Sequence, residues 1–367
     1  MAICKICFFV PYYPLIKGGA EYQAKIIAEE LTKFDYEVIY ISEGHELEGQ
    51  ELHNGFKVYK LTTPFGTVEK ATLYRRFMTK VNAIIAEENP DVIYQRILNT
   101  FTYRLSKFAN KSKIPFVLHI ADNYSVEFNK GYKSFFKERI FKDILKQRPY
   151  IICQTDYQKQ KIRQKGYEPA AKIPNMHPDI RVMGHEQKDK NSIVWIGNSR
   201  PVKQLEVFLK LAKDFESTNF LFHVIGKIPE SEYGFSLQEK LKVATNVEYH
   251  GEKTNAYINS FLIKSGLLVN TSASEGFSNT FIQAWMCGTP VLAFNSDPDG
   301  IMKKYAIGID CKGSYSDLSK GLLDILESDD YGSWCERALA TATSLFSTSE
   351  NISKFTSVLK TAINGRK

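Results

Sequence analysis

Segments with the pattern of buried β-strands alternate with amphipathic helical segments along the whole chain, and the series restarts near the middle. This alternation predicts parallel sheets, because parallel strands must be joined by long, usually helical, crossovers. The first series predicts strands at 3–10, 37–42, 58–62, 92–95, 116–120 and 150–154, with helices at 20–33 and 73–88. The second predicts strands at 192–196, 220–225, 247–249, 267–270, 290–293 and 309–311, with a helix at 205–214.

A turn-rich, polar stretch at 174–192 separates the two series. The predicted fold class is therefore α/β, with two facing Rossmann-like domains at 1–180 and 190–345. A final helix within 346–367 is expected to pack back on the N-terminal domain. Ligands of such sheets bind beyond the carboxyl ends of the strands, so we expect the active site in the cleft between the domains.

The net charge of +7 is confined to the N-terminal half, where residues 1–180 hold 27 Lys and Arg against 20 Asp and Glu. This excess indicates an anionic partner such as a phospholipid surface, a phosphorylated acceptor or nucleic acid. Within it, the basic segment 132–148 carries an apolar stripe at helical spacing. Two interpretations stay open: a helix lying on an anionic membrane, or a crossover helix whose stripe faces its own sheet.

The six cysteines are interpreted as buried structural thiols and indicate a reducing compartment, the cytoplasm. Cys4 and Cys7 form a CxxC, but residues three apart on a strand point to opposite faces, which favours structural thiols over a metal site. Residues 1–10 resemble a first strand rather than a signal peptide. No run of about 18 apolar residues predicts a membrane span.

The most informative segment begins with Glu275-Gly276, directly after a predicted strand and just before a helix. Amides at a helix start can bind an anion, and the Glu275 carboxylate can accept hydroxyl hydrogen bonds from a sugar. Gln283 lies eight residues later, on roughly the same helical face. The alternative is a plain helix N-terminus, with Glu275 interacting only with the helix dipole.

Two further turns join strands to helices. In the first, Gly197 is followed by Arg200 and Lys203, whose cations could clamp a diphosphate. In the second, Gly18-Gly19 allows close backbone approach to a phosphate or sugar. Solvated surface cations and an ordinary turn are the simpler explanations of these two segments.

The order of these motifs resembles glycosyltransferase family 4, the retaining, metal-independent branch with GT-B architecture. The resemblance covers nearly the whole chain and is carried by Gly18-Gly19-Ala20-Glu21, Pro90-Asp91-Val92-Ile93, Phe116–His119, Ile173-Pro174-Asn175, Gly197 with Lys203, and Glu275-Gly276-Phe277 through Gly288-Thr289-Pro290-Val291.

The resemblance implies roles for individual residues. Glu275 would hold hydroxyls of a donor hexose, and Lys203 would neutralise the diphosphate leaving group. Gly18 and Gly19 would pack against the donor, and His119 would lie beside its reacting carbon. Backbone amides would face the hexose and diphosphate along Gly276, Phe277, Ser278, Asn279 and Thr280.

The chain departs from the family pattern at two positions. Gln283 replaces the usual Glu that grips the ribose hydroxyls, although Gln can still accept and donate. Asn198 replaces a frequent Arg, and Arg200 is expected to supply that charge. Asp297 and Asp299 could hold a metal, but their loop is interpreted as a turn, and no metal ligand is predicted.

The sequence thus predicts a hexosyltransferase that acts with retention on a glycan or lipid-linked acceptor of cell-envelope polysaccharide synthesis. The expected co-substrate is a nucleoside-diphosphate sugar, UDP-sugar first, with no cofactor and no nucleic-acid partner. Peripheral contact with an anionic membrane through 132–148 would place it at the inner face of the cytoplasmic membrane. A non-catalytic sugar-nucleotide-binding subunit and a sugar-nucleotide epimerase stay open as alternatives. A nicotinamide-dependent oxidoreductase is disfavoured, because no strand is followed by Gly-x-Gly-x-x-Gly.

Overall fold

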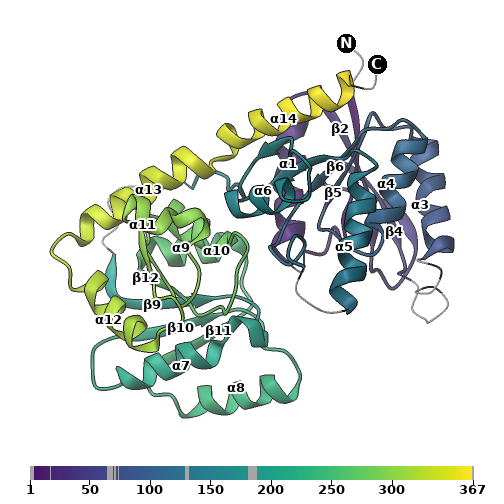
Figure 1. Cartoon of the computed structure of the whole chain (residues 1–367). Helices are drawn as coiled ribbons and strands as arrows, with labels where there is room; N and C mark the ends of the chain where they lie inside the picture. The colour runs from purple at the N-terminus through teal and green to yellow at the C-terminus, as the bar shows by residue number, and fades with distance from the viewer. Residues whose placement is uncertain are drawn as a thin grey trace. The chain divides into compact units, whose positions relative to one another are not determined.

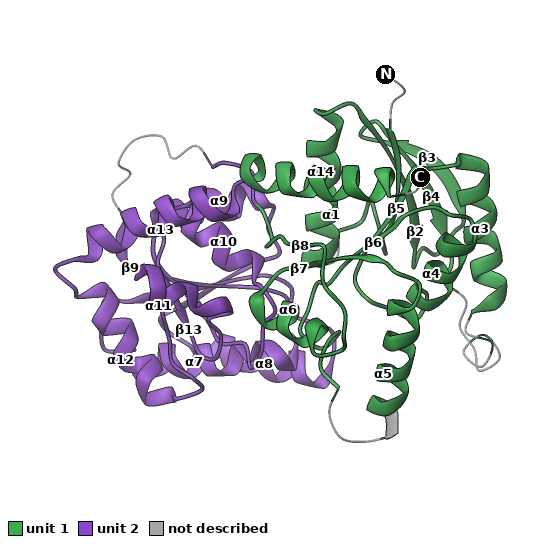
Figure 2. Cartoon of the chain, turned by 45° about the horizontal axis from the view of Figure 1, so that its top comes forward, with its two compact units in different colours: residues 1–176, 348–367 green, residues 177–347 purple. Residues whose placement is uncertain are grey.

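The computed structural model of the chain describes residues 4–16, 18–63, 69, 72, 74–128, 132–180 and 188–365. These residues form two compact units (Figures 1 and 2): unit 1 spans 1–176 and 348–367, and unit 2 spans 177–347. The chain therefore returns to unit 1 with its final helix. Part of the sequence-predicted linker, 181–187, lies outside the described residues.

Unit 1 is built on an eight-stranded sheet in the order β3-β4-β2-β1-β5-β6-β7-β8, in which only the β3–β4 pair is antiparallel. Its strands are β1 (Cys4–Phe9), β2 (Tyr36–Glu43), β3 (Gly49–His53), β4 (Phe56–Leu61), β5 (Val92–Arg96), β6 (Phe116–His119), β7 (Tyr150–Cys153) and β8 (Ala171–Lys172). Its helices are α1 (Gly19–Thr32), α3 (Arg75–Glu88), α4 (Thr102–Lys111), α5 (Tyr132–Leu145), α6 (Asp156–Arg163) and α14 (Thr348–Asn364).

Helices cover both faces of this sheet. One core joins alternate strand residues to apolar residues of α3, α4 and α5, and the other joins the remaining set to α1 and α14. Cys7 belongs to the first core, whereas Cys4 packs against the second. The prediction that this CxxC faces two ways is thus confirmed. Burial raises the pKa of Cys4 to about 11, so its thiol is protonated at neutral pH.

Unit 2 repeats the design with a six-stranded parallel sheet in the order β11-β10-β9-β12-β13-β14. Its strands are β9 (Asp189–Ile196), β10 (Leu221–Ile225), β11 (Val247–Gly251), β12 (Ser265–Asn270), β13 (Val291–Ala293) and β14 (Gly308–Asp310). Its helices are α7 (Leu205–Asp214), α8 (Glu232–Val243), α9 (Asn255–Lys264), α10 (Asn279–Met286), α11 (Ile301–Tyr305), α12 (Tyr315–Leu326) and α13 (Tyr331–Phe346).

The helices of unit 2 also lie on both faces of their sheet. Residues of α7, α8 and α12 complete one core, and residues of α9, α10, α11 and α13 complete the other. The predicted class, a doubly wound α/β fold in each half, is confirmed. None of the helices in the described ranges combines the length and hydropathy needed to cross a bilayer.

A buried polar network closes the carboxyl end of β6 in unit 1. His119 is fully buried, and its Nδ1 accepts a hydrogen bond from Arg96 Nη1 at 3.0 Å and lies 3.1 Å from the Tyr94 hydroxyl. Arg96 Nη2 in turn donates to Asn175 Oδ1. Burial and the Arg96 cation hold the pKa of His119 well below its ordinary value of 6.5. The imidazole is therefore neutral in the folded chain at neutral pH.

Stability should fall as the pH drops below about 6.5, because the unfolded chain then binds a proton that folded His119 excludes. One such proton contributes a slope of at most about 1.4 kcal/mol per pH unit. His119→Asn should flatten the pH dependence of the free energy of unfolding between pH 7 and 5, measured by circular dichroism in urea. His53→Asn, in the β3 hairpin strand, is the control. Equal slopes for wild type and His119→Asn would contradict the buried-network account.

Candidate functional site

The predicted site residues of unit 2 follow two neighbouring strands, β9 and β12, at the point where the strand order reverses. From β9 the chain goes first to β10 on one side, and later to β12 on the other. The crossovers therefore leave in opposite directions, which opens a crevice between the loops at the carboxyl ends. Lys203 lies in the loop after β9, and Glu275 lies in the loop after β12.

The structure brings Lys203 and Glu275 together in an ion pair between Lys203 Nζ and Glu275 Oε1. The same oxygen accepts hydrogen bonds from Ser272 Oγ at 2.7 Å and Asn270 Nδ2 at 3.3 Å. The Lys203 and Glu275 side chains are 21% and 12% exposed, so the pair is partly shielded but still open to a ligand. A carboxylate held by several donors is fixed in one orientation, as a sugar-binding group requires.

Hydrogen bonds between the two loops keep this pair in place. Thr271 Oγ1 donates to the Lys203 carbonyl at 2.8 Å and accepts from Trp195 Nε1 at 3.0 Å. The amide of Ala273 donates to the Val202 carbonyl at 2.9 Å. Trp195 is 2% exposed and anchors the arrangement to the core of unit 2. These hydrogen bonds fix the two loops relative to each other, which lowers the entropic cost of binding a ligand.

Sequence reasoning did not identify the supporting residues Trp195, Asn270, Thr271 and Ser272. A signal was present, because Asn270-Thr271-Ser272 places three short polar side chains directly at the end of a buried strand. Such residues hydrogen-bond locally in loops. The sequence does not show which second loop these polar residues bind.

The segment after Glu275 leads into α10, as expected. Phe277 is 6% exposed, and its ring packs 5.1 Å from that of Phe346 in the core of unit 2. Its side chain thus anchors the loop, and only its backbone is suited to contact a ligand. Ser278 Oγ lies 2.9 Å from Thr280 Oγ1 and makes no capping bond to α10, which begins at Asn279.

The two positions that depart from the family pattern differ in environment. Gln283 is 5% exposed, and its Nε2 donates to Asn259 Oδ1 of α9 at 2.5 Å. This bond uses one N–H of the side-chain amide that is predicted to meet the ribose. Asn198 and Arg200 are exposed, and the Arg200 carbonyl accepts from the Lys203 amide at 2.7 Å in a short 3₁₀ turn.

The remaining predicted residues belong to unit 1. Gly18 precedes Gly19, the first residue of α1, and a Cβ atom at Gly18 would lie 2.9 Å from Glu21 Oε2. Glycine therefore leaves room for this buried carboxylate. His119 lies inside the network with Tyr94 and Arg96, which gives it a structural role. Its predicted contact with a donor sugar stays a prediction.

The two acidic residues considered for a metal form a turn. Asp297 accepts hydrogen bonds from the amides of Met302 at 2.8 Å and Lys303 at 3.2 Å, which caps the start of α11. Asp299 adopts a left-handed conformation, with φ of 56°. The carboxylate of Asp297 is thus used for a local structural purpose, in line with the turn predicted from the sequence.

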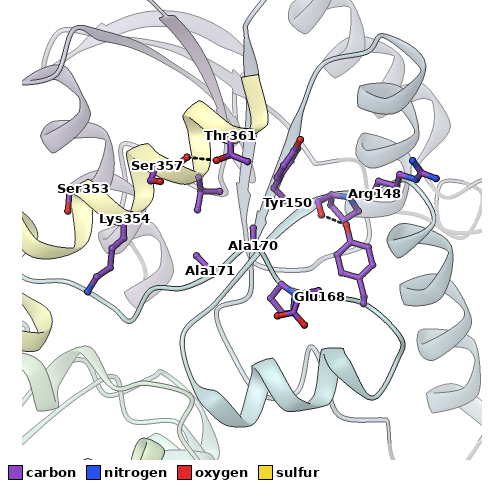
Figure 3. Close-up of a pocket in the computed structure, with 13 residues that line it drawn as sticks. Arg148, Tyr150, Glu168, Ala170, Ala171, Ser353, Lys354, Ser357 and Thr361 are labelled. Atoms are coloured by element: carbon purple, nitrogen blue, oxygen red, sulfur yellow. Dashed lines mark hydrogen bonds between the residues drawn. The ribbon is translucent and has the colours of Figure 1, made fainter. Parts of the chain in front are cut away.

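A cavity of about 790 Å³ in unit 1 contains none of the predicted site residues (Figure 3). Its walls include Arg148, Tyr150, Glu168 and Lys354. Tyr150 is the first residue of β7, so the cavity opens at the amino ends of the strands. Ligands of doubly wound sheets bind at the opposite ends, and the size of this cavity does not make it the functional site.

Two family models match the chain in succession. The model described as Glycosyltransferase Family 4 matches residues 17–176, and the one described as Glycosyl transferases group 1 matches residues 177–338. A curated relative, an uncharacterized glycosyltransferase of Methanocaldococcus jannaschii, is 23% identical over 341 residues, covering 90% of each chain.

Solved structures share the fold over nearly the whole chain. Anabaena HepE in complex with UDP and glucose has a TM-score of 0.72 at 15% identity, covering 98% of this chain and 100% of that one. Sucrose-phosphate synthase of Thermosynechococcus elongatus has a TM-score of 0.78 at 14% identity, covering 99% and 100%. WaaG, a glycosyltransferase involved in lipopolysaccharide biosynthesis, has a TM-score of 0.68 at 17% identity, covering 99% of each. With both halves matched by family models and this fold in common, the chain belongs to the family 4-type glycosyltransferases of GT-B architecture.

Proposed function

We propose that this glycosyltransferase moves a hexosyl group from a nucleoside-diphosphate sugar to a glycan or lipid-linked acceptor, with retention at the anomeric carbon, in cell-envelope polysaccharide synthesis. The observation that carries the proposal is the Lys203–Glu275 pair at the strand-order reversal of unit 2. The pair joins a carboxylate, a group that can accept hydrogen bonds from sugar hydroxyls, to a cation, a group that can bind phosphate. The solved relative HepE is complexed with UDP and glucose, which supports a UDP-sugar as the first donor to test.

In the proposed reaction, the bond between the anomeric carbon and the diphosphate oxygen breaks, and a bond to an acceptor hydroxyl oxygen forms on the same face. The acceptor proton passes to the departing diphosphate. Lys203 balances the negative charge that grows on this leaving group, an interaction that is stronger in the transition state than in the ground state. Glu275 holds the hexose by its hydroxyls and fixes the position of the reacting carbon.

The bond between Gln283 and Asn259 favours one alternative, a subunit that binds the donor without transferring it, because the amide predicted to meet the ribose already donates one of its N–H groups to Asn259. Incubating the purified chain with nucleoside-diphosphate sugars, with and without candidate acceptors, separates the possibilities. Transfer to an acceptor or hydrolysis of the donor supports the enzyme. An epimerised donor as product would indicate an epimerase, and unchanged donor that nevertheless binds would indicate the non-catalytic subunit.

Replacing Glu275 should abolish transfer while leaving the fold intact. Glu275→Ala should lower kcat/KM by about 100-fold or more, because the contact positions the reacting carbon. Glu275→Gln, which keeps the size but loses the charge, should lie between wild type and Ala. The control is Glu239→Ala, which removes one partner of the exposed ion pair with Lys242. Near-normal turnover by Glu275→Ala, with an unchanged circular dichroism spectrum, would remove Glu275 from the site.

Transfer should survive a chelator. Lys203 and the amino-terminal dipole of α10 supply the positive potential that a metal ion supplies in other transferases. The rate in EDTA should therefore match the untreated rate, measured well below the melting temperature. A loss that Mn²⁺ or Mg²⁺ restores would contradict metal independence and return attention to Asp297 and Asp299.

We also propose that α5 brings unit 1 to an anionic membrane surface, at the inner face of the cytoplasmic membrane. The single apolar stripe predicted from the sequence divides in two. Phe141, Ile144 and Leu145 are buried in the core of unit 1, whereas Phe135 is 61% and Phe136 43% exposed. The carboxyl-terminal half of α5 is thus an ordinary crossover helix. The other half presents aromatic rings among exposed cations, including Lys137 and Arg139.

The full-length chain should co-sediment with anionic vesicles and not with neutral ones, and added salt should weaken the binding, because each nearby cation contributes about 1 kcal/mol that ions screen. The double variant Lys137→Glu with Arg139→Glu should no longer bind anionic vesicles. The double variant Phe135→Ser with Phe136→Ser should bind them more weakly than the wild type. The control is Lys33→Glu with Lys354→Glu, two reversals at exposed positions of the same unit, one in the turn after α1 and one in α14. Equal binding to both vesicle types, or none to anionic ones, would leave α5 as scaffold alone.

A further inference from the structure

Three potential metal ligands meet on the two strands at one edge of the unit 2 sheet, β10 and β11 (Figure 1). His223 of β10 is paired with Glu248 of β11, and His250 lies two residues further along β11. Residues two apart on a strand share a face, so His250 joins the other two side chains on one side of the sheet. Their ligand atoms lie within 4.8 Å of one another.

The separations between these atoms fit a tetrahedral metal shell. His223 Nδ1 lies 3.1 Å from His250 Nε2 and 3.4 Å from Glu248 Oε2, and His250 Nε2 lies 3.8 Å from the same oxygen. Ligands bound to zinc at about 2.0–2.1 Å in tetrahedral geometry are roughly 3.4 Å apart. Small side-chain adjustments therefore suffice to place one ion at bonding distance from all three atoms.

The surroundings supply the support that metal-binding histidines need. The Tyr257 hydroxyl lies 3.4 Å from His250 Nδ1, the nitrogen on the far side of the ring, so it can accept that N–H and direct Nε2 at a metal. The ring of Phe261 packs edge-on against His223 at 4.9 Å and His250 at 5.2 Å. These contacts restrict the orientation of both imidazoles before any ion binds.

An adjoining cavity offers an entry path and room for a water ligand. It has a volume of about 770 Å³ and is lined by Asp189, Ser192, His223, Tyr257 and Phe261, among others. A neutral imidazole offers a ring nitrogen lone pair to a metal, and two such rings meet here. A ligand set of two imidazoles and one carboxylate favours transition metals over Mg²⁺ and Ca²⁺.

We propose that His223, Glu248 and His250 bind one divalent transition-metal ion, Zn²⁺ above all, with water at the fourth position. The ion ties β11, the edge strand, to its neighbour β10. His223 is in the middle of its strand, whereas Lys203 and Glu275 lie in loops beyond the strand ends. The metal is therefore structural and takes no part in transfer. A hydrogen bond between two neutral histidines is the competing explanation of the 3.1 Å separation.

Calorimetric titration of Zn²⁺ into the EDTA-treated, dialysed full-length chain tests the proposal. One ion per chain should bind, the melting temperature should rise with Zn²⁺ concentration, and Mg²⁺ should do neither. Co²⁺ at the same site should give the visible absorption of a tetrahedral complex. His250→Ala and Glu248→Gln change partly exposed side chains, so the chain should still fold, and His250→Ala should weaken Zn²⁺ binding by at least about 100-fold.

Two further variants separate a metal site from a histidine pair. Tyr257→Phe keeps the ring and should weaken binding by about 10-fold, as expected for a residue that positions a ligand. His53→Ala in unit 1 is the control and should bind Zn²⁺ as wild type does. Transfer by His250→Ala, assayed well below its melting temperature, should be unchanged, so the outcome is independent of the donor site. The proposal would be overturned if the wild type bound no Zn²⁺. It would also be overturned if both His250→Ala and His223→Asn bound Zn²⁺ as tightly as the wild type does.

Discussion

The ion pair between Lys203 and Glu275 is the interaction on which the proposed donor site of this glycosyltransferase depends. It joins the loops that follow two adjacent parallel strands, and the reversal of strand order between those strands is what leaves space above it. A cation and a carboxylate within hydrogen-bond reach are complementary to the two ends of a sugar diphosphate. Each side chain is the ion-pair partner of the other, which restricts the orientation of both charged groups.

The pair is useful only because its supports are rigid. Trp195 is buried in the core of unit 2, and its indole N–H holds Thr271, which in turn holds the Lys203 backbone. On the other side, Phe277 is fixed by Phe346. The Lys203 and Glu275 loops are thus held in place by residues whose rings pack in the apolar cores of unit 2.

Much of this arrangement was predictable from the sequence, because hydrophobic periodicity reports which segments are buried and glycine marks where strands end. Helix α7 was predicted with its observed bounds, whereas the strands β3 and β8 and the helices α4, α6, α8, α9, α11, α12 and α13 were not specified. Glu275 and Lys203 were predicted as separate motifs. Their direct pairing, the burial of His119 and the division of the α5 stripe all depend on contacts between segments far apart in the sequence. The His223–Glu248–His250 cluster likewise required the register of β10 against β11.

The central claim is that the loops after β9 and β12 bind the diphosphate of a nucleotide donor. The most direct test compares equilibrium dissociation constants of nucleoside diphosphates with those of the parent nucleosides, UDP with uridine and GDP with guanosine, for wild type and Lys203→Met. The account predicts that one diphosphate binds the wild type at least about 100-fold more tightly than its nucleoside, equivalent to about 2.7 kcal/mol. Lys203→Met should remove most of that difference. Equal affinities for diphosphate and nucleoside, or a preference that Lys203→Met leaves intact, would contradict the account.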